Sequence, residues 1–181
     1  MPSPRKAGFL ANDSVPDTAT TYWARDTRPL TPGERALVPE AFARELPLDS
    51  VRIVLCAHNP FARNKVLVRG RRLFWPGAPA DVSREGAGFQ TLLVHELAHV
   101  WQYETGRLTA LRYLTDPRNW QYGYAAGSEF ESLGTEAQAD LVADWWRVRQ
   151  GLAPLRHIGA PPTRVWLESV IPFGRPLSLP V

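Results

Sequence analysis

The sequence predicts an α+β fold with a small, mostly antiparallel sheet and two long helices. Short runs rich in β-branched and aromatic residues at 51–55, 66–68 and 73–75 indicate strands. Residues 89–104 and 134–150 carry apolar side chains at helical spacing, and the first of these segments is apolar nearly all round, which is typical of a buried helix. With 44% hydrophobic and 22% charged residues, the composition excludes a disordered or fibrous protein.

The composition divides the chain into three segments. Residues 1–28 are polar and rich in Pro, Ser, Thr and Asp, so we expect a flexible N-terminal arm. Residues 29–153 carry the strong periodic signals and form the predicted domain. Residues 154–181 are rich in proline, and we expect a C-terminal extension packed on the domain, with at most one short helix near 163–169.

Two local patterns refine this outline. Thr31 followed by Glu34 predicts a capped helix start, and the helix should run to about Glu45 with a break at Pro39. Residues 107–133, between the two long helices, are rich in Tyr and Trp without clear periodicity, so we expect a long irregular connection there.

Several classes of protein are excluded or disfavoured. Cys56 is the only cysteine, which excludes an internal disulfide and a multi-cysteine metal site. No run approaches the roughly 18 consecutive apolar residues of a membrane span. The first residues are followed by no apolar core of the kind that secretory signals need, so we expect no signal peptide and a cytoplasmic location at synthesis.

The charge distribution argues against nucleic-acid binding. There are 21 Lys and Arg against 18 Asp and Glu, a net charge of only +3, and no recognition motif is present. The single tight basic cluster is Arg69-Gly70-Arg71-Arg72. We expect it to be a solvated turn at a strand edge, and a polyanion site is the alternative.

The residues His95-Glu96-Leu97-Ala98-His99 spell H-E-x-x-H within the first long helix. Histidines four residues apart lie one turn above each other on one face of a helix, so both imidazoles can bind one Zn²⁺. Glu96 follows the first histidine directly and can act as general base toward a water on the metal. Burying two imidazoles and a carboxylate in an apolar helix without a metal or other partner would be unfavourable.

The second long helix offers the rest of a catalytic metal site, which needs a third protein ligand. Glu136 is placed to be that ligand, and Asp140, one turn later on the same face, can accept a hydrogen bond from a ligating histidine. The alternatives are Asp140 as the third ligand, His58 or His157 in that role, or an acidic helix face that simply meets solvent.

These segments resemble a known family. H-E-x-x-H followed by E-x-x-x-D on a later helix is similar to the gluzincin pattern of zinc metallopeptidases. The wider match resembles the small zincin-like metallopeptidase domains associated with the VgrG spike proteins of type VI secretion, some of which are antibacterial toxins. It rests on H-E-L-A-H-V-W-Q at 95–102, E-A-Q-A-D at 136–140, L-T-P-G-E-R at 30–35 and V-R-I at 51–53.

The resemblance implies a compact zincin fold with one catalytic Zn²⁺ bound by His95, His99 and Glu136, and with Glu96 as the base. It implies a zinc-dependent endopeptidase with a protein or peptide substrate. An immunity or inhibitor protein and a secretion-spike protein are candidate partners, and export by a contractile secretion system is a candidate route.

Two functional questions stay open at this point. A donor for the oxyanion is expected, and Tyr124, which precedes the Glu136 helix, ranks first, with Tyr122, Tyr113 and His157 behind it. The competing function is a catalytically silent, metal-stabilised zincin scaffold that binds a protein partner. An open fourth position on the metal favours the enzyme, and a site closed by four protein ligands favours the scaffold.

Overall fold

The computed structural model describes residues 27–58 and 65–173. Most of the expected N-terminal arm lies outside these residues. Its last two residues, Thr27 and Arg28, begin strand β1 (Thr27–Pro29) and are therefore part of the folded domain. The domain boundaries that the sequence predicts otherwise stay predictions.

The predicted small sheet is present and has four strands in the order β1-β2-β4-β3. The further strands are β2 (Arg52–Val54), β3 (Leu67–Arg69) and β4 (Arg72–Phe74). The outer pairs, β1 with β2 and β3 with β4, are antiparallel, whereas β2 and β4 run parallel. Strand β3 is therefore an edge strand, and it contacts the first of the two long helices.

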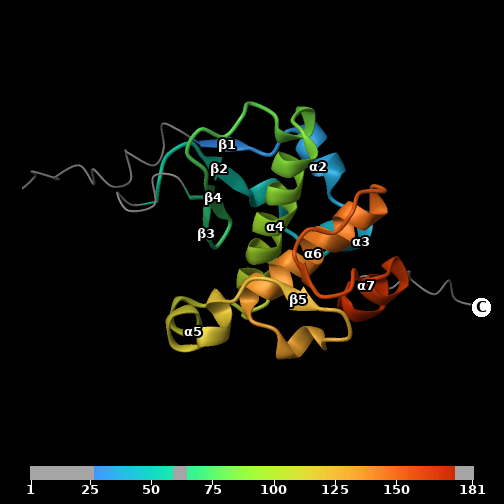
Figure 1. Cartoon of the computed structure of the whole chain (residues 1–181). Helices are drawn as coiled ribbons and strands as arrows, with labels where there is room; N and C mark the ends of the chain where they lie inside the picture. Colours follow the sequence, from blue (N-terminus) through green and yellow to red (C-terminus); the bar gives the residue numbers. More distant parts are fainter. Residues whose placement is uncertain (1–26, 59–64, 174–181) are drawn as a thin grey trace, which may run out of the picture.

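The two predicted long helices are α4 (Ala87–Glu104) and α6 (Thr135–Arg149). They pack against each other across the middle of the molecule, and the sheet lies on the other side of α4 (Figure 1). Gly106 and Gly151 follow their ends with φ of +70° and +74°, which fits glycine as the residue that ends a helix. In the described part of the chain, no helix is long and apolar enough to cross a membrane.

The capped start and the break expected in the first helical region are both present. The Thr31 side chain accepts a hydrogen bond from the Glu34 backbone, and the Glu34 carboxylate accepts one from the Thr31 backbone. The capping box of α2 (Pro32–Leu37) is therefore complete. A second short helix, α3 (Glu40–Ala43), follows Pro39, because proline has no N–H to continue the first one.

The connection expected to be irregular contains short ordered elements. It holds α5 (Ala110–Thr115), the 3₁₀ turns η4 (Pro117–Trp120) and η5 (Phe130–Ser132), and the strand β5 (Tyr124–Ala125). Thr109 and Asp116 cap the first two by accepting backbone N–H groups. Such single-turn elements are too short to leave a periodic pattern in the sequence.

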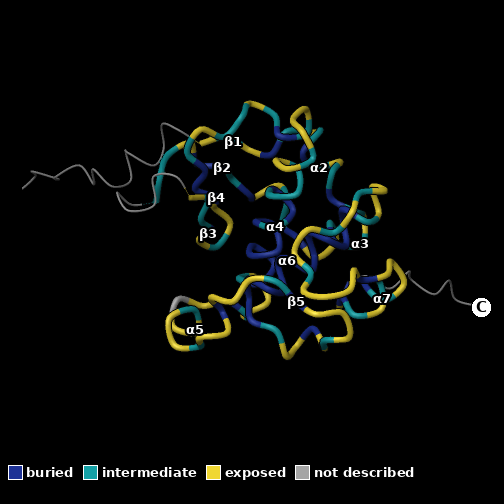
Figure 2. Tube along the Cα trace, in the orientation of Figure 1, coloured by how far each residue is buried: buried dark blue, intermediate teal, exposed yellow. Residues whose placement is uncertain are grey.

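The C-terminal segment joins the same core as the rest of the domain. Strand β6 (His157–Ile158) pairs in parallel with β5, and α7 (Arg164–Val170) confirms the short helix expected near 163–169. Leu167, Ile171 and Phe173 are buried, and the Phe173 ring stacks on Phe42 at 4.4 Å between centroids. Burial is greatest along α4 and α6 (Figure 2).

A buried ion pair ties the N-terminal strand to this core. Glu34 is fully buried and accepts hydrogen bonds from both terminal nitrogens of Arg28, at 2.8 and 2.7 Å, and from the backbone of Val82 at 2.9 Å. Burial alone raises the pKa of Glu34, but the bonds from Arg28, Val82 and Thr31 outweigh it, so the pKa lies below its usual value.

We predict that Glu34→Ala lowers the free energy of unfolding by about 3–5 kcal/mol, because Arg28 is left without its carboxylate. Glu40→Ala, which removes an exposed pair with Arg44, should cost less than about 1 kcal/mol. Denaturant unfolding measures both. Because the pKa of Glu34 is lower in the folded state, the pair stabilises fully above the usual pKa of 4.5, and the deficit of Glu34→Ala should shrink as the pH falls below it. Equal losses in the two variants would contradict this account.

Candidate metal centre

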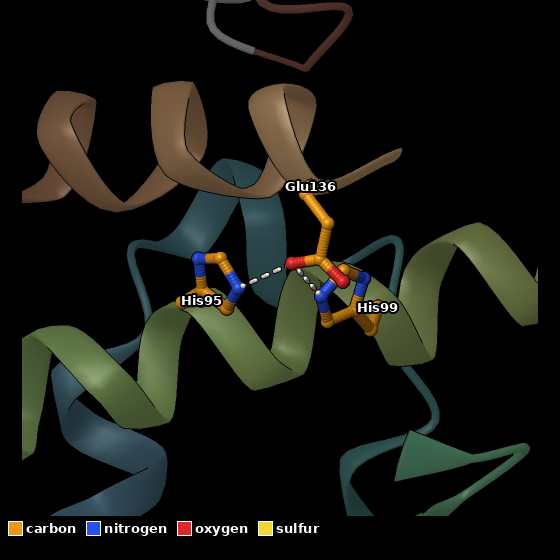
Figure 3. A group of neighbouring side chains, drawn as sticks. All are labelled: His95, His99 and Glu136. Atoms are coloured by element: carbon orange, nitrogen blue, oxygen red, sulfur yellow. Dashed lines mark hydrogen bonds and ion pairs between the residues drawn. The ribbon is translucent and has the colours of Figure 1, made fainter. Parts of the chain in front are cut away.

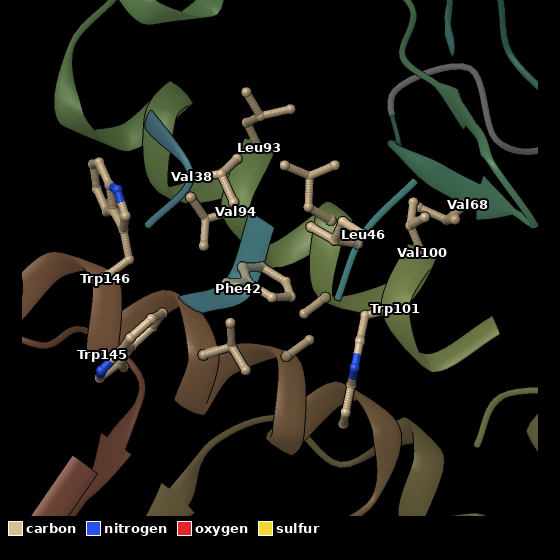
Figure 4. Packing of buried hydrophobic residues seen from close by; sticks show 14 of the residues in the cluster. Val38, Phe42, Leu46, Val68, Leu93, Val94, Val100, Trp101, Trp145 and Trp146 are labelled. Atoms are coloured by element: carbon tan, nitrogen blue, oxygen red, sulfur yellow. The ribbon is translucent and has the colours of Figure 1, made fainter. Parts of the chain in front are cut away.

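One stripe of α4 carries polar side chains into the interior. His95, His99 and Gln102 follow one another at i, i+4 and i+7, so they lie on the same face of the helix. In the middle of the helix, the other side chains pack in the hydrophobic core, which fixes the rotation of the helix about its axis (Figure 4). The core side chains of α4 in that view include Leu93, Val94, Val100 and Trp101.

The start of α6 is held so that Glu136 faces this stripe. Asn119 in η4 accepts the Thr135 backbone N–H through its side-chain oxygen at 3.0 Å. Gly134 passes so close to the Arg118 backbone that a Cβ atom would lie 1.9 Å from the Arg118 carbonyl oxygen. Only glycine fits this approach, and it places Glu136 in the first turn of α6.

Three side chains converge where the two helices meet. Figure 3 shows Glu136 reaching down from α6 between His95 and His99 of α4. One carboxylate oxygen of Glu136, Oε2, lies 3.3 Å from Nε2 of each histidine. Ligands that are each about 2.0–2.1 Å from one tetrahedral ion lie about 3.3 Å apart. The three atoms are therefore spaced as ligands of a single small cation would be.

The other ring nitrogen of His95 is directed at Asp140. Its Nδ1 lies 3.2 Å from Asp140 Oδ1, and the second oxygen of Asp140 accepts the Gly123 backbone N–H at 2.8 Å. A carboxylate only accepts hydrogen bonds, so Nδ1 of His95 carries a proton, and in the neutral ring that binds a metal Nε2 would turn its lone pair toward Glu136. Asp140 thus has the orienting contact expected from the sequence.

A chain of amides fixes the second histidine in the same way. Gln138 donates its Nε2 protons to the carbonyls of Phe130 and Leu133, so its oxygen faces Gln102. Gln102 then donates to that oxygen and to the Thr135 carbonyl, which leaves its own oxygen 2.8 Å from Nδ1 of His99. Nδ1 of His99 is therefore the donor, and its Nε2 also faces Glu136 as an acceptor.

This arrangement fits a bound cation. Each imidazole nitrogen lies 3.3 Å from the same carboxylate oxygen, and the three acceptor atoms lie within 4.8 Å of one another. Such acceptors repel unless a proton or a metal ion lies among them. The pKa shifts of His95 and Glu136 also fit a bound cation. Burial lowers the pKa of His95, but Asp140, Glu136 and the charge of Glu96 raise it to about 10. Burial raises the pKa of Glu136, but the two histidines lower it to about 2. The cluster therefore attracts positive charge.

Glu96 lies beside the three converging residues, at a small cavity of about 160 Å³. The cavity is lined by His95, His99, Glu136, Glu96, the edge strand β3 and the side chains of Tyr113 and Tyr122. Burial raises the pKa of the Glu96 carboxyl, while the histidines oppose this rise. A carboxylate with a raised pKa is a stronger proton acceptor than an ordinary one.

Tyr124, which the sequence ranks first as oxyanion donor, lies away from the metal cavity. Its ring is buried, its hydroxyl donates to Asp144 at 2.9 Å, and it does not line the cavity. The chain direction at β5 turns this side chain toward α6 and α7, where it stacks on Trp166. Tyr122, two residues earlier, lines the metal cavity, and 58% of its surface is exposed. Partial burial and the nearby charge of Glu136 raise the pKa of Tyr122, so its phenol stays protonated and can donate a hydrogen bond.

The remaining candidate ligands lie outside the converging group. His157 Nδ1 lies 3.1 Å from the Gly159 carbonyl oxygen, and His58 lies against Phe74 on the sheet, so neither reaches the cluster. Asp140 contacts Nδ1 of His95 and is not one of the three residues whose ligand atoms converge. The acidic residues of α6 do not form a solvent face, because Glu136, Asp140 and Asp144 are all buried.

Sequence reasoning missed Gln102, Gln138 and Asn119, which are buried and hold the ligands in place. A signal for Gln102 was present, because it lies three residues after His99 on the same helix face. Asn119 and Gln138 had no such signal, because their partners are distant in the chain or in backbone turns.

Comparisons with known proteins support this fold. Neither a protein-family model nor a curated protein sequence matches the chain. Among solved structures, it is similar to the effector domain of Pseudomonas aeruginosa VgrG2b, with a TM-score of 0.57 and 24% sequence identity. The match covers 68% of this chain and 75% of that one. The two chains share a fold. At this identity the likeness establishes the fold alone, so the chemistry depends on the side chains of the metal centre.

We predict that Gln102→Leu weakens Zn²⁺ binding by about 10–100-fold, because His99 loses the acceptor that orients its ring. The matched control is Gln90→Leu on the same helix, whose amide donates to the Ser83 and Glu85 carbonyls, away from the metal centre. Competition with a chelator of known affinity measures both. An unchanged affinity in Gln102→Leu would show that the amide chain does not orient the ligand.

Proposed function

We propose that this protein is a zinc-dependent endopeptidase of the zincin type. The observation that carries the proposal is the convergence of His95 Nε2, His99 Nε2 and Glu136 Oε2, with Glu96 at the same cavity. Two imidazole nitrogens and one carboxylate are a donor set that suits catalytic zinc. Only these three described residues form the group, which leaves the fourth position for water and favours an enzyme over a structural metal.

His95, His99 and Glu136 would hold the ion, and when bound it lowers the pKa of a water toward neutrality and polarises a carbonyl oxygen. Glu96 then accepts the proton of the attacking water at its carboxylate and passes it to the leaving amine. Burial of Glu96, which raises its pKa, favours both uptake and release of that proton. Asp140 and Gln102 keep the two imidazoles in the tautomer that presents Nε2.

Tyr122 takes the role that the sequence gave to Tyr124. Its hydroxyl is a proton donor at the cavity beside Glu136, where it can donate to the oxygen of the tetrahedral intermediate. Tyr113 lines the same cavity from α5 and is the second candidate.

The resemblance of the metal-binding segments, together with the fold shared with the VgrG2b effector domain, supports a delivered effector or toxin. In this proposal a type VI secretion spike carries the domain out of the producing cell. The substrate is a protein or peptide of the target, and an immunity or inhibitor protein that covers the cavity would protect the producer.

We predict that Glu96→Gln lowers peptide hydrolysis by about 10²–10⁴-fold while the bound zinc is unchanged, because the amide cannot take up the proton. The exposed Glu129 provides the control, and Glu129→Gln should have wild-type activity. Cleavage of a peptide library and elemental analysis of each variant measure the two quantities.

His95→Ala, His99→Ala and Glu136→Ala should each lose zinc as well as activity, whereas His157→Ala on β6 should keep both. If the wild-type protein binds zinc but cleaves no peptide, the silent binding scaffold becomes the better description. If the Glu96→Gln variant cleaves as fast as the wild type, the assignment of the base fails.

We predict that Tyr122→Phe lowers kcat by about 10²–10³-fold without loss of zinc, because a donor to the developing oxyanion is removed. Tyr124→Phe should keep kcat and instead lower the free energy of unfolding by about 1–3 kcal/mol, because buried Asp144 loses a donor. Steady-state kinetics and denaturant unfolding distinguish the two. Loss of kcat in Tyr124→Phe alone would return the donor role to Tyr124.

A further inference from the structure

Three arginines stand side by side across the sheet. Arg52 of β2 pairs in register with Arg72 of β4, and Arg72 pairs in register with Arg69 of β3. Residues in register point to the same face of a sheet, on strands about 4.8 Å apart, so the three side chains form a row about 10 Å long. Like charges directly opposite each other destabilise a sheet unless something compensates them.

Within residues 27–58 and 65–173, no carboxylate lies at ion-pair distance from any of these three guanidinium groups. In this part of the chain, Arg52 donates to the carbonyls of Asp49 and Val51, and Arg69 donates to the Tyr103 hydroxyl at 3.3 Å. Their neighbour Arg71 differs, because Glu104 holds it with two bonds of 2.9 and 2.7 Å. The row therefore keeps its positive charge, while Arg71 is neutralised.

The row lines a concavity of about 720 Å³ on the sheet. His58 at its wall has a lowered pKa, because of burial and of the positive charge of Arg69. Arg69 lines the metal cavity as well, next to Lys65 and the rest of β3. The concavity and the metal cavity are therefore adjacent and share one cationic side chain.

We propose that the arginine row, Arg52, Arg69 and Arg72, binds the acidic side chains of a polypeptide substrate whose scissile bond lies at the metal centre. This inference rests on the proposed peptidase function and adds the substrate class. A polypeptide that leaves the metal cavity past Arg69 reaches Arg72 and then Arg52 after a few residues. Guanidinium groups bind carboxylates through paired hydrogen bonds.

Single-stranded nucleic acid is less well matched to this surface, because its binding needs exposed aromatic rings on which bases stack. Besides His58, the concavity is lined by one aromatic side chain, Phe74, and that side chain is buried.

The test is cleavage profiling of a proteome-derived peptide library with the zinc-loaded full chain. We expect Asp and Glu to be enriched on one side of the cut within about five residues, since an extended chain rises about 3.3 Å per residue. The enrichment should fall about fivefold in Arg72→Gln and further in Arg52→Gln/Arg72→Gln, since exposed charge pairs are worth a few tenths to one kcal/mol each. Arg84→Gln removes an exposed charge from the 3₁₀ turn η3 (Val82–Arg84) and should keep the wild-type profile.

Cleavage without acidic enrichment overturns the inference and leaves the peptidase function intact. If no peptide is cleaved, this result counts against the peptidase function. A binding measurement with an acidic peptide then tests whether the arginine row recognises acidic side chains. A fluorescein-labelled deca-glutamate peptide should bind the wild type, more weakly with added salt, and about fivefold more weakly to Arg72→Gln. No binding of this peptide, or equal binding to Arg72→Gln, overturns the inference. Tighter binding of a DNA oligonucleotide or of phosphatidylglycerol vesicles than of the peptide also overturns the inference.

Discussion

The candidate metal centre depends on one constraint, the approach of three hydrogen-bond acceptors to a single point. Nε2 of His95 and of His99 each lie 3.3 Å from one oxygen of Glu136. The protons of both imidazoles are directed away from that point, toward Asp140 and Gln102. Without a proton or a metal ion among the three atoms this geometry is repulsive, and with one it is favourable. The packing of α4 on α6 maintains it, because the core fixes how both helices are rotated.

The side-chain amides around this point are buried and hydrogen-bonded, whereas the buried Thr135 Oγ1 has no hydrogen-bond partner among the described residues. Gln102 and Gln138 form a continuous chain of amides between the two helices, and Asn119 joins the start of α6 to the connection before it. Such a network has one arrangement in which every donor meets an acceptor, and that arrangement selects the histidine tautomers. The same contacts therefore serve the fold and the chemistry, so a variant in this network is expected to change both stability and metal affinity.

Charge is segregated on the two sides of the edge strand β3. The helix side holds Glu96, Glu136 and Asp140 around the imidazoles, whereas the sheet side holds uncompensated arginines. A cation in the first region and an acidic polypeptide along the second would balance both. Arg69, which lines both cavities, links the chemistry at the metal to recognition on the sheet.

Local patterns in the sequence were enough to predict the elements that form through short-range contacts. The capping box at Thr31, the two long helices and the spacing of His95 and His99 follow from contacts within a few residues, and all are present. Glu136 and Asp140 are predictable because their helix period places them on one face. The position of Tyr124 away from the cavity, the contacts of Gln138 and Asn119, and the arginine row follow only from how distant segments pack. Local patterns cannot predict features that depend on segments distant in the chain. Such features include the direction of a side chain on a two-residue strand, the partner of a side-chain amide and the register of neighbouring strands.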